Sequence, residues 1–170
     1  MILFTSMNPE LLTLPTEREG VILRQLTIED APYYFDSWQH SAEDICRFDP
    51  DTRGLYTTLE EVQASIIDSS HRRIRMGVWD SDKFVGTTNL RPDEEEGVWL
   101  LGYWTDSRET GHGYASLAAK ALSRYGADHF TVIRAEVMIE NAPSVKILEK
   151  IGFTSLGRKV GEFALFEMTR

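Results

Sequence analysis

Residues 108–115, with the sequence Arg-Glu-Thr-Gly-His-Gly-Tyr-Ala, could bind a phosphate group. They follow an apolar, aromatic segment at 98–104 that is typical of a buried strand. A strand, a glycine loop and a helix in this order present backbone N–H groups and the positive end of a helix dipole to an anion. Arg108 would add a cation. The helix is indicated by one apolar face, made of Tyr114, Leu117, Ala118, Ala121, Leu122 and Tyr125.

Two familiar nucleotide loops do not fit this segment. A Rossmann loop needs a third glycine where this chain has Ser116, and a Walker loop needs Gly-Lys-Ser/Thr where Tyr114 follows Gly113. The remaining pattern is Arg-x-x-Gly-x-Gly. A Gly-x-Gly pair often only begins a helix, so further residues must support a phosphate site.

Two other segments supply that support. Downstream, Asn141-x-x-Ser144 opens a short helix that ends in Gly152-Phe153, and upstream residues 19–31 indicate a strand followed by a helix entry. With the loop, these segments resemble the GNAT acetyltransferases, in particular the RimJ/RimL-like branch. The resemblance covers roughly residues 17–170.

The resemblance implies the fold class. It is α/β (α+β): a mixed central sheet of about six to seven strands with a splayed central pair, flanked by about four helices. A chain of 170 residues suits one such domain, 1–170, and we interpret residues 1–16 as an N-terminal arm. The pattern predicts strands at 21–26, 74–79, 84–90, 97–104, 131–139, 154–158 and 162–168.

The same pattern predicts four helices. Asp30 would cap the first, which runs to about Gln39, and residues 41–57 would form a surface loop. A Thr58-x-x-Glu61 capping box opens the second, with Leu59, Val62, Ile66 and Ile67 facing inward. Helices at 114–129 and after Asn141 complete the set, and residues 80–83 would link a hairpin.

By resemblance, acetyl-CoA is the acetyl donor and its pantetheine arm lies between the splayed strands. The main chains of Tyr103, Trp104 and Thr105 would contact the arm, together with Asn141 and Ser144. Asn141 could equally be a plain helix cap. The residues whose N–H groups would hold the pyrophosphate are Arg108, Glu109, Thr110, Gly111, His112, Gly113, Tyr114 and Ala115.

The resemblance also implies catalytic roles. Ser144 would protonate the leaving thiolate, since the tyrosine that many family members use is replaced by Leu148; a serine that only caps the helix is the alternative. An amine that is charged at neutral pH needs a base. Glu96 is the first candidate base and Glu136 the second.

The first two helices and the loop between them would form the acceptor wall. The acceptor is a primary amine, either a protein N-terminus or a small amine, and the sequence does not choose between them. Each candidate contact could also be an ordinary packing aromatic. The candidates are Trp38, His40, Phe48 and Tyr56.

Composition limits the partners. The net charge of −9 opposes binding to nucleic acid and to anionic membranes, and no apolar run reaches the length of about 20 residues that spans a bilayer. Cys46 is the single cysteine, which suits a cytoplasmic location. The four histidines show no zinc-ligand spacing, so we expect no metal. The resemblance also allows a homodimer.

We therefore predict direct acetyl transfer in a ternary complex, because no nucleophile is placed to carry an acyl group. One rival is an acyl-CoA-binding module without transferase activity, which Leu148 in place of tyrosine would permit. Another is an interaction domain that has lost CoA binding. The intact Arg108, Gly111, Gly113 and Asn141 argue against the second rival.

Overall fold

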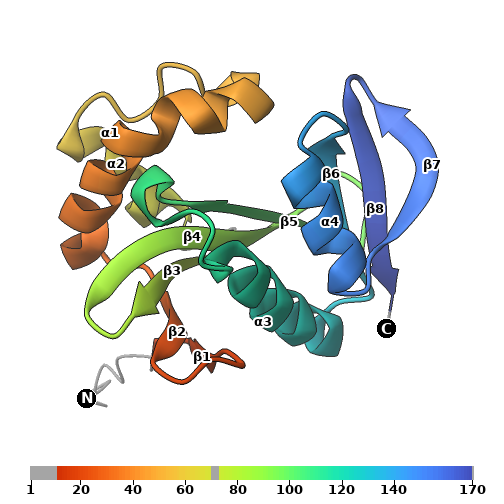
Figure 1. Cartoon of the computed structure of the whole chain (residues 1–170), viewed down its shortest axis with the longest axis horizontal. Coiled ribbons are helices and arrows are strands. Elements are labelled where there is room, and N and C mark those ends of the chain that lie inside the picture. The colour runs from red at the N-terminus through yellow and green to blue at the C-terminus, as the bar shows by residue number, and fades with distance from the viewer. Residues whose placement is uncertain (1–10, 70–72, 170) are drawn as a thin grey trace, which may run out of the picture.

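The computed structural model describes residues 11–69 and 73–169, which form one sheet of eight strands in the order β1-β2-β3-β4-β5-β6-β8-β7. All neighbouring strands are antiparallel except β5 and β6, which run parallel. Figure 1 shows α3 crossing in front of the sheet near β4 and β5, while α1 and α2 lie together on the other side of the molecule from α4 and the β7–β8 hairpin. The α/β sheet and its helices confirm the predicted fold class.

The elements have these bounds. The strands are β1 Thr13–Pro15, β2 Val21–Gln25, β3 Ile74–Asp80, β4 Lys83–Pro92, β5 Val98–Thr105, β6 Val132–Met138, β7 Thr154–Val160 and β8 Phe163–Thr169. The helices are α1 Ala31–Phe48, α2 Leu59–Ser69, α3 Tyr114–His129 and α4 Ala142–Lys150, with 3-10 turns at Ile28–Asp30, Pro50–Thr52 and Ser107–Glu109. No helix in the described ranges is both long and apolar enough to cross a membrane.

Two hydrophobic clusters cover the sheet. The larger joins alternate strand residues such as Met76 and Val78 to the apolar face of α3 and to α4. The smaller joins Trp79 and Phe84 to α1 and α2. Because neighbouring residues of a strand point to opposite faces, the two clusters hold different helices against the same strands.

The sheet opens at its centre. β5 and β6 pair only at Val98, Trp99 and Leu100, whose partners on β6 are Val132, Ile133 and Arg134. Beyond Leu100, β5 continues to Thr105 and β6 continues to Met138 without pairing to each other. From residue 101 onward, one edge of the β5 backbone pairs with β4 and the other edge, which faces β6, is left unpaired by the described strands. This confirms the predicted splay.

The N-terminal half departs from the sequence-based prediction. The first helix was expected to stop near Gln39, but α1 runs to Phe48. The polar residues at 43, 44 and 47 are exposed, while Ala42 and Ile45 continue the inner face against the second cluster. Polar content indicated a loop, whereas the helical spacing of these two apolar residues decided the structure.

Smaller differences concern α2 and the ends of the sheet. The capping box is confirmed, since Thr58 and Glu61 exchange hydrogen bonds of 3.3 and 3.2 Å, but Ile67 is 57% exposed rather than inward-facing. Part of the expected arm is a strand, because β1 pairs with β2; residues 1–10 lie outside the described residues. The β3–β4 hairpin turns in two residues, not four.

Candidate active site

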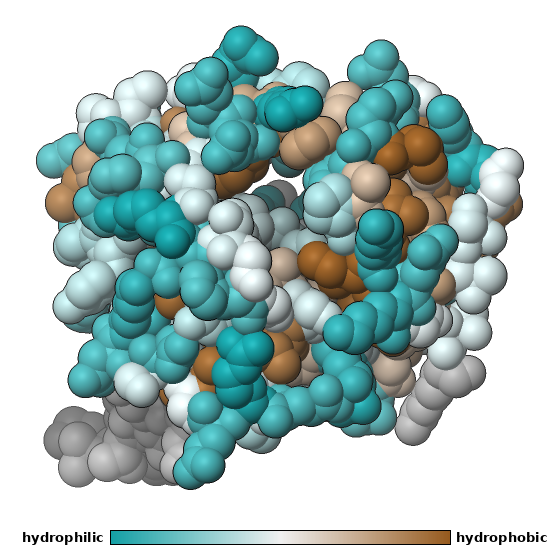
Figure 2. All heavy atoms as spheres, viewed as in Figure 1, coloured by the Kyte–Doolittle hydropathy of each residue, from teal (hydrophilic) through white to brown (hydrophobic). Residues whose placement is uncertain are grey.

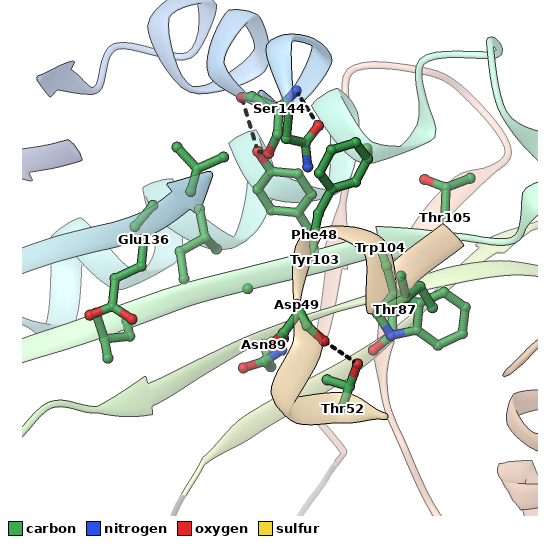
Figure 3. Close-up of a pocket in the computed structure, with 18 of the residues that line it drawn as sticks. Phe48, Asp49, Thr52, Thr87, Asn89, Tyr103, Trp104, Thr105, Glu136 and Ser144 are labelled. Atoms are coloured by element: carbon green, nitrogen blue, oxygen red, sulfur yellow. Dashed lines mark hydrogen bonds between the residues drawn. The ribbon is translucent and has the colours of Figure 1, made fainter. Parts of the chain in front are cut away.

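A cavity of about 590 Å³ occupies the opening between β5 and β6. Its walls come from the end of α1, the segment before α2, strands β3 to β6, and the start of α4. Figure 2 shows the surface hollowed at this place, and Figure 3 shows polar side chains reaching into it from several elements. Unpaired backbone on β5 and a cavity beside it are what an extended, amide-containing ligand requires.

The predicted phosphate loop connects β5 to α3. Gly111 and Gly113 have φ angles of 83° and 79°, which side-chain-bearing residues rarely adopt, and a Cβ at Gly111 would meet nothing within 4 Å. The hydrogen bond from Leu117 N–H to the Gly113 carbonyl, at 3.1 Å, is part of the first turn of α3. The N–H groups ahead of Leu117 are therefore at the free end of the helix, where an anion is stabilised.

Arg108, which the sequence predicted as a fixed cation beside the loop, is held by two carboxylates. Its guanidinium donates to Asp106 at 2.6 and 3.0 Å and to Asp36 at 2.8 Å. Burial opposes ionisation of Asp106, but the hydrogen bonds from Arg108 outweigh it and lower the pKa of Asp106 to about 2. Arg108 thus ties the start of the loop to α1, and two carboxylates balance its charge.

Another arginine lies closer to the loop glycines. The Nη2 atom of Arg18, from the turn between β1 and β2, is 3.5 Å from the position that a Cβ at Gly113 would take. The same guanidinium lies over the ring of Tyr114 at 5.6 Å. The sequence analysis did not single out Arg18, because 90 residues separate it from the loop that it approaches (108 − 18 = 90).

Asn141 and Ser144 meet at the start of α4. The Oδ1 atom of Asn141 accepts a hydrogen bond from the Ser144 N–H at 3.3 Å, so Asn141 caps the helix. Both residues also line the cavity. The Ser144 hydroxyl has a partner outside the helix, since its Oγ atom lies 2.8 Å from the Oη atom of Tyr103.

Tyr103 is a side chain whose role the sequence analysis missed. Figure 3 shows its ring rising from β5 with the hydroxyl aimed at Ser144. Burial raises the pKa of Tyr103 to about 12, so the phenol is protonated at neutral pH. Leu148, at the position of the missing family tyrosine, is buried. A phenol from β5 therefore lies next to the serine. The sequence signal for it was the alternation of a strand, in which the side chains of Tyr103 and Trp104 point to opposite faces.

Three of the four predicted acceptor contacts line the cavity: Trp38, Phe48 and Tyr56. Trp38 is also structural, because its indole N–H donates to the Leu55 carbonyl at 3.0 Å. His40 is not among the cavity residues. It lies on the exposed face of α1, where its carbonyl accepts a hydrogen bond from Ser107 at 2.8 Å.

The candidate bases differ in whether they line the cavity. Glu96 is exposed in the turn before β5 and is not among the residues that line the cavity. Glu136 lines the cavity and lies 4.0 Å from Arg91. Asp49, at the end of α1, also lines it, and both burial and the neighbouring Asp51 raise the pKa of Asp49, while Arg91 opposes the rise. Sequence reasoning missed Asp49 because it placed residues 41–57 in a surface loop.

Comparison with known proteins fits this geometry. Residues 21–154 match the family described as the acetyltransferase (GNAT) domain. The chain belongs to the GNAT acetyltransferase family. An uncharacterized N-acetyltransferase, p20 of Bacillus licheniformis, is 28% identical over 152 residues, which cover 85% of this chain and 84% of that protein.

Solved GNAT acetyltransferases have a similar fold. RimL, the ribosomal L7/L12 α-N-protein acetyltransferase, in complex with coenzyme A matches with a TM-score of 0.79 and 15% identity over 93% of this chain and 98% of that chain. RimJ of Mycobacterium smegmatis with CoA-disulfide matches with a TM-score of 0.74 and 20% identity over 94% and 86% of the two chains. The microcin C7 self-immunity acetyltransferase MccE, with acetyl-CoA and AMP, matches with a TM-score of 0.75 and 14% identity over 90% and 94%.

Proposed function

We propose that this GNAT acetyltransferase transfers the acetyl group of acetyl-CoA directly to a primary amine in the cavity between β5 and β6. The observation that carries the proposal is the pairing of Ser144 with Tyr103 beside unpaired β5 backbone. RimL and MccE, which share the fold, have been solved with CoA or acetyl-CoA. A cytoplasmic location and an amine on a protein or a small molecule remain parts of the proposal.

The donor fits the residues present. Its pyrophosphate would accept hydrogen bonds from N–H groups of residues 108–115, with Arg18 adding positive charge at Gly113. Its pantetheine amides would pair with the open β5 backbone at Tyr103, Trp104 and Thr105 and with Asn141. The open space around Gly111 leaves room for a close approach of phosphate oxygens, and at Gly113 the nearest group is the Arg18 guanidinium.

Ser144 supplies the proton for the leaving group. The acceptor nitrogen attacks the thioester carbon, the C–S bond breaks, and the Ser144 hydroxyl gives its proton to the thiolate. The Tyr103 and Ser144 hydroxyls share a hydrogen bond, and with the phenol as donor the serine can be reprotonated from it. This arrangement replaces the missing tyrosine at Leu148, and it disfavours the alternative of an acyl-CoA-binding module without activity.

We place the base at Asp49 rather than Glu96. Asp49 lines the α1 wall of the cavity, and its raised pKa makes it a better proton acceptor than an ordinary aspartate. Because a base must be deprotonated to act, the rate should rise with pH as Asp49 ionises. Asp49→Asn should remove this acidic limb of the pH profile, whereas Glu136→Gln should leave it in place.

Ser144→Ala tests the proposal. If Ser144 protonates the thiolate, kcat should fall about 10²-fold while acetyl-CoA still raises the melting temperature. If Ser144 is only a cap, the variant should lose roughly 1 kcal/mol of stability and keep its rate. Steady-state kinetics and melting curves of one preparation separate the two, and full kcat would rule out the acid role.

Two further variants serve as controls for this test. Gly113→Glu places a negative side chain at the loop and should abolish the acetyl-CoA shift in melting temperature. Cys46→Ala should remain active, since transfer is direct and the thiol carries no acyl group. Ping-pong kinetics or an acetylated Cys46 would contradict direct transfer.

A further inference from the structure

A buried arginine in the acceptor part of the cavity has no carboxylate partner among the described residues. Arg75, near the start of β3, is 7% exposed. Its guanidinium donates to Ser65 Oγ at 2.8 Å and to Tyr56 Oη at 3.3 Å, and it lies over the Tyr34 ring at 4.6 Å. Within residues 11–69 and 73–169, the guanidinium forms no ion pair with an aspartate or glutamate. Hydroxyls and a ring compensate a buried charge only in part.

Arg75 lies in line with the part of β5 that is not paired with β6. Arg75 pairs across the sheet with Asn89 of β4, and Asn89 pairs with Gly102 of β5. Directly opposed residues share a face, so these three lie in one row on the floor of the cavity. The Asn89 amide, over Gly102, has no hydrogen-bond partner in the described part of the chain.

The backbone is strained beside this arginine. Tyr56 has a φ angle of 54°, which is uncommon for a bulky residue. Its hydroxyl is held by Ser65 at 2.9 Å and by Arg75, and its ring packs edge-on against Trp38 with centroids 5.0 Å apart. Such strain persists where surrounding contacts enforce it, frequently at ligand sites.

Most charged side chains of the cavity lie on two walls. The end of α1 and the turn after it contribute Asp44, Asp49 and Asp51, whereas Arg73 lies just before β3 and Arg75 lies in β3. Arg91 of β4 and Glu136 of β6 also line the cavity, and these two lie 4.0 Å from each other. A simple alkylamine or a polyamine has no group for the arginines. A ligand that bears both an ammonium and an anionic group complements both walls.

We propose that the amine acceptor carries a carboxylate, which Arg75 binds with help from Asn89. This inference rests on the proposed acetyl transfer and specifies its acceptor. The row from β3 to β5 spans two strand spacings, about 10 Å. The carboxylate is therefore several bonds away from the amine that reacts beside β5. An ω-amino acid and a peptide with a free N-terminus and an acidic residue near it both have this form.

The test compares acceptors that differ only in charge. One pair is ε-aminocaproate and its carboxamide; the other is a short peptide with glutamate in its second position and the same peptide with glutamine there. We expect kcat/KM to favour at least one carboxylate by about 10- to 100-fold, as for a charge-assisted hydrogen bond. The pair that shows the preference identifies the source of the carboxylate. Equal kcat/KM in both pairs would overturn the inference.

Arg75 variants locate the preference. Arg75→Gln should remove the preference for the carboxylate, but keep activity on the uncharged acceptor of each pair and the rise in melting temperature with acetyl-CoA. Arg75→Lys should restore part of the preference. Arg124→Gln, at an exposed position of α3 that pairs with Glu17 outside the cavity, is the matched control and should keep the full preference. A preference that survives in Arg75→Gln would assign the carboxylate to another residue.

A binding measurement separates this inference from the proposed function. Caproate, which has the carboxylate and no amine, should raise the melting temperature of the wild-type protein more than its amide does. It should lose this effect in Arg75→Gln. If no amine is acetylated but caproate binds through Arg75, the transferase proposal fails and the anion site stands. If amines are acetylated but caproate has no effect at any concentration, the anion site fails alone.

Discussion

Two arginines with the same burial lie in opposite environments. Arg134 on β6 and Arg75 on β3 are each 7% exposed. Arg134 forms ion pairs with Asp93 at 3.2 Å, Glu95 at 2.9 Å and Glu167 at 3.0 Å, whereas Arg75 contacts only hydroxyls and rings among the described residues. One buried charge is neutralised within the protein, and the other is left for a ligand. Burial alone therefore does not distinguish a structural charge from a functional one, but the partners do.

The contrast also explains the acidic turn at 93–96. Four consecutive acidic residues of this kind are typical of a solvated turn, or could form a charged rim for a cationic acceptor. Two of its carboxylates, Asp93 and Glu95, instead pair with Arg134 next to the short paired stretch of β5 and β6. The acids that line the cavity are different ones, at the end of α1, in the turn after it and at Glu136 of β6.

The largest effect should come from removing the paired arginine. Arg134→Met leaves three carboxylates facing one another, of which the Asp93 and Glu167 side chains are only 19% and 20% exposed. We expect the free energy of unfolding to fall by about 2–3 kcal/mol. Urea unfolding measures it, with Arg158→Met on the exposed strand β7 as a control that should change stability by less than about 0.5 kcal/mol. A loss below about 1 kcal/mol would show that the ion pairs of Arg134 do not contribute substantially to the stability of the fold.

A third arginine, Arg108, makes a contribution to stability that depends on pH. Arg108 is about half exposed but lowers the pKa of the buried Asp106 from 3.8 to about 2. The folded-state pKa lies below the unfolded value, so the stabilisation is present above pH 4 and is lost as the pH falls toward 2. It amounts to about 2 kcal/mol. Asp106→Asn should lose this amount at neutral pH and flatten the acid limb of stability, and an unchanged acid limb would contradict the linkage.

Much of the donor half of the site could be predicted from the sequence. The splayed pair was expected from the family resemblance, whereas the glycine loop and the Asn141 cap depend on local signals: special φ angles, a capping side chain, and a strand followed by a helix. These signals are encoded within a few residues, and the family resemblance places them in order. Ser144 was predicted to face the cavity for the same reason, and it does.

The acceptor half could be predicted less well, because its geometry depends on distant contacts. Asp49 and Tyr56 take their positions from the unexpected length of α1 and from packing against β3. The partners of Arg108 were predictable only in part, because Asp106 is two residues away but Asp36 lies 72 residues away. Arg75 did leave a signal: it is a charged residue inside the otherwise apolar segment 74–79. A charge in a strand with that pattern indicates either a partner or a ligand.

Of the substitutions at Arg134, Asp106 and Arg75, Arg75→Met should cause the smallest change in stability. Methionine has a similar length and can pack its sulfur against the Tyr34 ring. The Tyr56 and Ser65 hydroxyls lie 2.9 Å apart and can satisfy each other once the guanidinium is gone. Since no carboxylate of the described chain is left unpaired, we expect the free energy of unfolding to change by less than about 1 kcal/mol. Transfer to carboxylate-bearing amines should nevertheless fall. A loss of stability as large as that of Arg134→Met would instead make Arg75 a structural residue, and the anion site would lose its support.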